Sequence, residues 1–213
     1  MDVNATRATY EIQFGNVERE TTNNYSWDTA KFEACGHKWA DLSENSSGVS
    51  LLNDCKYGYS IKKGDMSLTL IKSGTYPNED ADIGEHRFTY SIYPHAGRWQ
   101  EAKTVEMAYN LNVPMPVKRI GKQKGCGEEY DSFLHCDKES CFIEVIKKAE
   151  DGDGVIVRMY ENKNNRVRAH ITSGRALVHV YECNLLEEKE AELTVVERPL
   201  KLYSNHMRSK HSG

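Results

Sequence analysis

The strongest constraint on the fold is a set of segments in which apolar and polar side chains alternate along the chain. Residues 88–93, 155–160 and 166–172 show this period of two most clearly. Successive side chains of a β-strand point to opposite faces of a sheet, so the alternation predicts half-buried strands. Further strand candidates are residues 8–14, 31–35, 49–53, 67–72, 141–147, 177–182 and 192–197.

Short polar turns separate these candidates. Residues 62–65 (KKGD) and 151–154 (DGDG) supply Gly and Asp where a hairpin needs a positive φ. Residues 161–165 (ENKNN) form a third polar turn. Many short strands with regular turns are typical of an antiparallel sandwich or barrel. The sequence therefore predicts an all-β, antiparallel fold.

Three segments depart from the period of two. Residues 99–111 place apolar side chains near helical spacing, which predicts one short helix. Residues 114–137 follow neither period and predict a long loop prone to disorder. The polar and basic residues 204–213 predict a frayed tail, which leaves residues 1–203 as the folded region.

The length, charge balance and hydropathy of the chain exclude several functional classes of protein. The chain has 213 residues, enough to bury a core without a disulfide or metal staple. Its 28 Lys and Arg against 32 Asp and Glu argue against a nucleic-acid partner, which normally meets a basic surplus. No segment approaches the about 20 apolar residues of a membrane span, and the amino terminus lacks a signal peptide. The sequence thus predicts a cytoplasmic protein.

The residues alone assign no catalytic group and no metal ligand. Asp80 and Asp82 lie in a polar loop, and no nucleophile elbow or phosphate loop is present. A group of four thiol and imidazole side chains lacks the second Cys pair of a structural zinc site, so free thiols are favoured over a thiol- or zinc-dependent site. This group is Cys126, His135, Cys136 and Cys141.

A sugar-binding surface is a weaker indication. Three tryptophans and 12 tyrosines offer flat apolar faces that suit pyranose rings, although aromatic residues of a sandwich more often form the core. A stand-alone carbohydrate-binding or interaction domain without catalysis is therefore one reading of this chain.

An ordered series of motifs supports a second reading. The series resembles the C-terminal β-sandwich region of glycoside hydrolase family 38 α-mannosidases of the cytosolic and bacterial type, and it runs from about Asn4 to about Glu188. It consists of residues 10–16 (YEIQFGN), 26–28 (SWD), 37–44 (HKWADLSE), 51–58 (LLNDCKYG), 84–90 (GEHRFTY), 93–95 (YPH) and 148–150 (KAE).

The resemblance implies a large antiparallel β-sandwich, part of a supersandwich of the galactose-mutarotase type. It also implies a parent enzyme that is a retaining, zinc-dependent α-mannosidase acting on mannose-containing glycans or oligosaccharides. In such enzymes the nucleophile and the zinc ligands belong to an N-terminal catalytic domain of the same polypeptide. No counterpart of that domain is present in these residues, so the chain is expected to be an inactive, incomplete part of the enzyme that holds no zinc.

The resemblance further implies that one strand-end loop of the sandwich reaches the mannose pocket. By motif position that loop is residues 53–58, with Asn53, Asp54, Lys56 and Tyr57 as the expected substrate-binding residues. The alternative is an ordinary β-turn whose Asn and Asp bond their own backbone.

Other residues of the motifs are expected to hold strands and the domain junction together rather than to touch sugar. They are His37, Trp39, Asp41, His86 and His95. Strands missing from an incomplete sandwich would leave open sheet edges, which predicts self-association into homo-oligomers.

Overall fold

The computed structural model describes residues 2–125, 131–196 and 201–207. It divides the chain into two compact units, Met1–Lys118 and Arg119–Gly213. Every strand pair in these described ranges is antiparallel, which confirms the predicted fold class. The predicted short helix is present, and the structure adds a second helix of only five residues, which is too short to show a helical period in the sequence.

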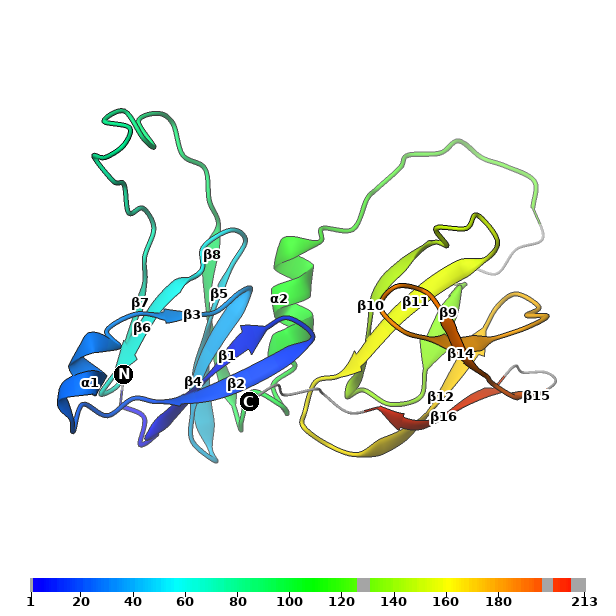
Figure 1. Cartoon of the computed structure of the whole chain (residues 1–213), viewed down its shortest axis with the longest axis horizontal. Coiled ribbons are helices and arrows are strands. Elements are labelled where there is room, and N and C mark those ends of the chain that lie inside the picture. Colours follow the sequence, from blue (N-terminus) through cyan, green and yellow to red (C-terminus); the bar gives the residue numbers. More distant parts are fainter. Residues whose placement is uncertain (1, 126–130, 197–200, 208–213) are drawn as a thin grey trace. The chain divides into compact units, whose positions relative to one another are not determined.

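The first unit contains a five-stranded sheet, a three-stranded sheet and both helices (Figure 1). In spatial order the larger sheet is β2 (Gly15–Glu20), β1 (Arg7–Ile12), β4 (Trp39–Ser43), β5 (Ser47–Asn53) and β8 (Tyr90–Ala96). The smaller sheet is β3 (Ala34–Cys35), β6 (Gly58–Lys62) and β7 (Asp65–Leu68). The helices are α1 (Ser26–Ala30) and α2 (Thr104–Asn112).

The core of this unit lies between the two sheets. Tyr10 of β1 meets Tyr59 of β6 edge to face, with ring centroids 6.0 Å apart. Small and branched residues complete the cluster: Ala8, Ala40, Leu42, Leu51 and Ile61. Lys63 and Gly64 both have positive φ between β6 and β7, so the turn predicted at residues 62–65 is confirmed.

Helix α2 covers the opposite face of the larger sheet. The Trp39 ring packs against Trp99, with centroids 5.0 Å apart, and both side chains are buried. Ser50 of β5 shares a 2.8 Å hydrogen bond with Thr104 at the start of α2. Successive side chains of β4 and β5 therefore pack into two different layers, one toward the smaller sheet and one toward α2, because the side chains of a strand alternate between its two faces.

The second unit is built from short strands in three sheets. The sheets are β10 (Cys141–Lys148) with β11 (Val155–Glu161); β15 (Val195–Val196), β16 (Lys201–Met207), β12 (Val167–Ser173) and β9 (Leu134–Cys136); and β13 (Tyr181–Cys183) with β14 (Lys189–Glu192). The predicted DGDG turn joins β10 to β11. The predicted polar turn at 161–165 is held by the buried Glu161 carboxylate, which accepts the N–H groups of Lys163 and Asn165.

Two segments expected to lack structure contain strands. Strand β9 lies within the expected loop 114–137, of which residues 126–130 are outside the described ranges. Strand β16 includes residues 204–207 of the expected frayed tail and pairs with β12, while residues 208–213 are outside the described ranges. Neither helix in the described part has the length and apolarity needed to cross a bilayer.

Candidate functional site

A polar hollow of about 370 Å³ opens in the first unit where β5 ends. Its wall is the connection from β5 to β6, joined by residues from the β1–β2 turn, from the segment directly before β4 and from the end of α2. The lining consists of Gln13, His37, Lys38, Asn53, Asp54, Cys55, Lys56, Tyr57 and Asn112. All four expected substrate-binding residues thus line one concave surface, but they differ in exposure and in the contacts that they make.

Asn53 is the buried anchor of this wall, with 1% of its surface exposed. Its side-chain Nδ2 donates to the His37 carbonyl oxygen at 3.0 Å and to the Tyr59 hydroxyl. Its Oδ1 accepts the backbone N–H groups of Cys55 and Lys56 at 3.1 and 2.5 Å. Because these contacts occupy both ends of the amide, Asn53 shapes the loop.

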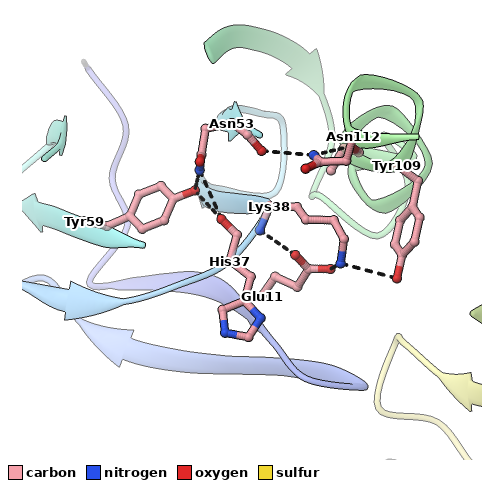
Figure 2. Close-up of polar contacts among 8 residues, drawn as sticks. Glu11, His37, Lys38, Asn53, Tyr59, Tyr109 and Asn112 are labelled. Carbon is pink, nitrogen blue, oxygen red and sulfur yellow. Dashed lines mark hydrogen bonds and ion pairs between the residues drawn. The ribbon is translucent and has the colours of Figure 1, made fainter. Parts of the chain in front are cut away.

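Helix α2 and Lys38, directly before β4, lie against the same anchor (Figure 2). The Asn112 amide donates to the backbone oxygen of Asn53 at 2.9 Å and to Ala108 of its own helix at 2.8 Å. Beside it, the Lys38 ammonium donates to the carboxylate of Glu11 at 3.1 Å and to the Tyr109 hydroxyl at 3.5 Å. Three elements distant in sequence therefore meet at the base of the hollow.

The charged groups of the loop lie at the surface. The Asp54 carboxylate accepts the N–H of Thr89 at 2.9 Å, and this bond holds the pKa of the carboxyl below its usual range. The same carboxylate raises the pKa of the neighbouring Cys55 thiol. The Lys56 ammonium lies over the Phe88 ring at 4.9 Å and has no carboxylate within ion-pair distance among the described residues.

Tyr57 presents the main apolar surface of the hollow, with 59% of the residue exposed. Its ring meets the His37 ring edge to face at a centroid distance of 5.6 Å. Burial, together with the charge of Lys38, lowers the pKa of His37, so the imidazole is neutral at neutral pH and can both donate and accept. The pair offers an aromatic platform with a polar edge.

Sequence reasoning missed several lining residues. His37 lines the hollow although a scaffolding role is expected for it, and its membership of the same motif series as residues 53–58 was the available signal. Gln13 and Asn112 carry no signal in the sequence, because only the packing of α2 and the β1–β2 turn brings them to the loop.

The other motif residues lie elsewhere. The buried His95 ring faces Asp41 at 2.8 Å through Nε2 and the Gly97 carbonyl oxygen at 3.1 Å through Nδ1. Trp39 is a core residue, as expected. His86 is exposed and faces the Asp82 carbonyl oxygen at 2.7 Å.

Metal-ligating side chains do not gather in the described residues. No three His, Cys, Asp or Glu side chains there are arranged to hold a metal ion. Cys136 and Cys141 of the candidate thiol group are free thiols that form no disulfide, and Cys126 lies outside the described ranges. The described residues therefore do not fit a zinc ion.

Two family models match the chain. The model of the glycosyl hydrolases family 38 C-terminal domain matches residues 1–80, and that of the family 38 C-terminal beta sandwich domain matches residues 141–208. The chain belongs to the C-terminal region of glycosyl hydrolase family 38. The predicted resemblance is thereby confirmed.

Similar proteins agree with this family 38 assignment. The chain is 44% identical over 190 residues to α-mannosidase G of Dictyostelium discoideum, covering 87% of this chain and 18% of that protein. It is 36% identical over 205 residues to α-mannosidase 2C1 of Homo sapiens, covering 94% and 20%. A crystal structure of an α-mannosidase from Enterococcus faecalis V583 has the same fold, with a TM-score of 0.75 at 16% identity, covering 97% of this chain and 24% of that one. The chain thus spans about a fifth of the length of these curated relatives.

Proposed function

We propose that this chain is a non-catalytic β region of a retaining, zinc-dependent α-mannosidase that releases terminal α-mannose, and that the hollow after β5 forms one wall of the mannose pocket. The proposal is supported by the family 38 membership, by relatives that are named α-mannosidases, and by the hollow at the end of β5. The observation that carries it is the exposed Tyr57–His37 platform held beside a buried Asn53 anchor.

The chemistry of the hollow suits a sugar. The exposed Tyr57 ring can stack on the apolar face of a pyranose. The Lys56 ammonium and the neutral His37 ring can bond hydroxyl groups, and the Asp54 carboxylate can accept from them. Asn53 acts through the loop, because its amide is already bonded inside the protein. The substrate contacts therefore belong to Asp54, Lys56, Tyr57 and His37.

The same lining is poorly suited to hydrolysis. A retaining glycosidase needs two carboxyl groups about 5–5.5 Å apart, one to attack the sugar and one to protonate the leaving group. Asp54 is the single carboxylate in the lining, and the nearby Glu11 is buried against Lys38. We therefore assign the nucleophile and the proton donor to a catalytic domain that precedes this region in the same polypeptide.

Zinc belongs to that catalytic domain in this proposal. A bound zinc would hold and polarise sugar hydroxyls, and none of its ligands is taken from the described residues of this chain. The wall formed by residues 53–58 would contact the bound sugar. Mannose-containing glycans and the catalytic domain are then the partners of this region, and the enzyme works in the cytoplasm.

The test is mutagenesis in the full-length enzyme. Tyr57→Ala and Lys56→Ala should each lower kcat/KM for p-nitrophenyl α-mannoside about tenfold, the effect of losing one well-formed contact. Lys63→Ala in the exposed β6–β7 turn is the matched control and should change kcat/KM less than about twofold. Unchanged kcat/KM in both loop variants would contradict the proposal.

The isolated chain provides the complementary measurement. The 213-residue chain should not hydrolyse p-nitrophenyl α-mannoside, because its hollow lacks a carboxyl pair. Turnover that a chelator abolishes would place the catalytic centre in this chain. Tight binding of methyl α-mannoside to the isolated chain would favour a stand-alone carbohydrate-binding domain instead.

A further inference from the structure

Two exposed aromatic rings lie at helix α1 of the first unit, which is drawn in blue in Figure 1. Tyr25 directly precedes the helix and Trp27 is its second residue, and each is 67% exposed. Their ring centroids are 6.5 Å apart, with the ring planes tilted by 53°. Neither residue lines the hollow after β5. The pair, here called the α1 aromatic surface, is therefore separate from the candidate site described above.

The exposure of Trp27 sets it apart from the other tryptophans of the chain. Trp39 and Trp99 are buried, with 1% and 5% of their surface exposed. Trp27 belongs to the SWD motif of residues 26–28, for which the loop at residues 53–58 has no use. Large apolar groups gathered in water at one place are typical of a binding surface.

Polar groups with unused hydrogen-bonding capacity accompany the rings. The Asp28 carboxylate accepts the N–H groups of Asn24 and Tyr25 at 2.9 and 3.1 Å, both through Oδ2. These two bonds hold the pKa of Asp28 below its usual range, so the carboxylate is charged. Asn23 accepts the Thr29 hydroxyl through Oδ1 at 3.3 Å. Within the described part of the chain, Oδ1 of Asp28 and Nδ2 of Asn23 make no hydrogen bond, so one acceptor and one donor remain for a ligand.

The composition of this segment favours a neutral sugar as that ligand. Residues 22–31 (TNNYSWDTAK) contain no Leu, Ile, Val or Met, and their single Asp and single Lys balance in charge. An anionic lipid surface or a nucleic acid would instead be attracted by a basic surplus. Aromatic rings can cover the apolar face of a pyranose, while amide and carboxylate groups bond its hydroxyls.

The two rings alone are too small for a stable protein interface. Fully covered Tyr and Trp side chains bury about 150–250 Å² each, so the pair supplies about 500 Å² at most. A stable interface takes about 800 Å² from each partner. One or two pyranose rings match the area of the α1 aromatic surface better than a second copy of the chain does.

We propose that the α1 aromatic surface binds a sugar unit of a mannose-containing glycan, at a site separate from the hollow. The Trp27 ring stacks on the apolar face of the pyranose, and Asp28 accepts hydrogen bonds from its hydroxyl groups. This step rests on the proposed function, because that function is what brings a mannose-containing glycan to the chain.

Oxidative footprinting of the full-length enzyme tests the site residue by residue. The probe is an α-mannotriose whose glycosidic oxygens are replaced by sulfur, so that it resists hydrolysis. As the probe reaches saturation, hydroxyl-radical oxidation of Trp27, measured by peptide mass spectrometry, should slow about tenfold, because the bound sugar shields the ring in proportion to its occupancy. Oxidation of the exposed Phe133 is the internal reference, since it corrects for radicals that the sugar itself consumes. Equal slowing of Trp27 and Phe133 would overturn the proposal.

The sample without probe checks for a competing occupant. Trp27 should be oxidised much faster than the buried Trp39, as its exposure requires. If both are oxidised equally slowly in the full-length enzyme, a protein surface already covers Trp27 and the proposal is wrong.

A substitution then tests whether Trp27 holds the sugar. In the Trp27→Ala variant the probe should no longer protect Tyr25, because the stacked ring is gone. In the matched control, Phe133→Ala, protection of Tyr25 should remain. The Trp27→Ala enzyme should keep kcat/KM for p-nitrophenyl α-mannoside within about twofold, because an exposed residue outside the hollow contributes little there. A tenfold fall in this kcat/KM would reject a separate site.

These results separate the α1 aromatic surface from the proposed function. The proposed function is read from kcat/KM of the Tyr57 and Lys56 variants, and the α1 aromatic surface is read from the protection of Trp27 and Tyr25. Protection of Trp27 with unchanged kcat/KM in the loop variants would retain the α1 site and reject the sugar-binding wall. Lowered kcat/KM in the loop variants without protection of Trp27 would reject the α1 site alone.

Discussion

Replacing Asn53 by Ala should show how strongly one buried amide stabilises the wall of the hollow. The substitution removes four side-chain hydrogen bonds, two donated by Nδ2 and two accepted by Oδ1. It leaves the backbone contacts with Lys38 and Asn112 in place. The expected defect is therefore local to the β5–β6 connection and its junction with β6.

The four bonds do not contribute equally. The N–H groups of Cys55 and Lys56 belong to residues with access to water, so losing Oδ1 costs little beyond the fixed shape of the loop. The Nδ2 bonds are buried, and each contributes about 1 kcal/mol net, with a further ~1 kcal/mol for the released loop, which gives a loss of about 3 kcal/mol. Because Tyr59 still donates to the His37 carbonyl oxygen, that oxygen keeps one partner.

Urea denaturation followed by tryptophan fluorescence measures this loss. All three tryptophans, Trp27, Trp39 and Trp99, belong to the first unit, so the signal reports the unit that contains Asn53. The control is Asn45→Ala, which removes an exposed contact with Arg98 and should cost about 0.5 kcal/mol or less. A loss for Asn53→Ala below about 1 kcal/mol would refute the reasoning that its amide anchors the loop.

Two further predictions concern the second unit. Burial, and next the neighbouring Cys136, raise the pKa of Cys141 to about 12, so iodoacetamide should modify it at least about tenfold more slowly than the exposed Cys35 at pH 8, measured by peptide mass spectrometry; equal rates would contradict the buried environment. For Asp137, partial burial raises the carboxyl pKa, but the backbone N–H and ring of His170 outweigh it and bring the pKa to about 2. Because this folded-state pKa lies below the unfolded value of about 3.9, the stabilisation is complete above that value and is lost as the pH falls through about 2. An NMR titration midpoint near the unfolded value would contradict this contact.

Local patterns predicted the strands along which apolar and polar residues alternate. Strands β10 and β11 follow the alternation and meet at the predicted DGDG turn, and α2 overlaps the predicted helical segment, ending one residue beyond it. Strand β4 was missed although four of its five residues are buried, because its two buried faces erase the alternation that marks a half-buried strand. Strand β2 was missed because half of its residues are charged, as befits a sheet edge.

In the candidate site, too, the sequence indicates where the loop lies but not the role of each of its residues. The motif series drew attention to residues 53–58, and the structure places that loop at a hollow. The separate roles within the loop depend on tertiary contacts that no local pattern contains. Asn53 and Asp54 are adjacent polar residues in the sequence, but Asn53 is enclosed by His37, Tyr59 and Asn112, whereas Asp54 is exposed and bonds Thr89.

The alternation in β8 separates two rows of side chains, and only one of these rows packs within the first unit. Its apolar row, Tyr90 and Ile92, faces outward in this chain, while Tyr93 and the buried His95 ring face α2 and its preceding turn. The first row is apolar and the second is bonded to neighbouring residues, so neither face of β8 suits contact with water. A strand with this composition is expected to be covered on both sides, and the first unit covers one. Because Asp54 and Lys56 contact Thr89 and Phe88 directly before β8, a partner that covers β8 would also steady the wall of the hollow.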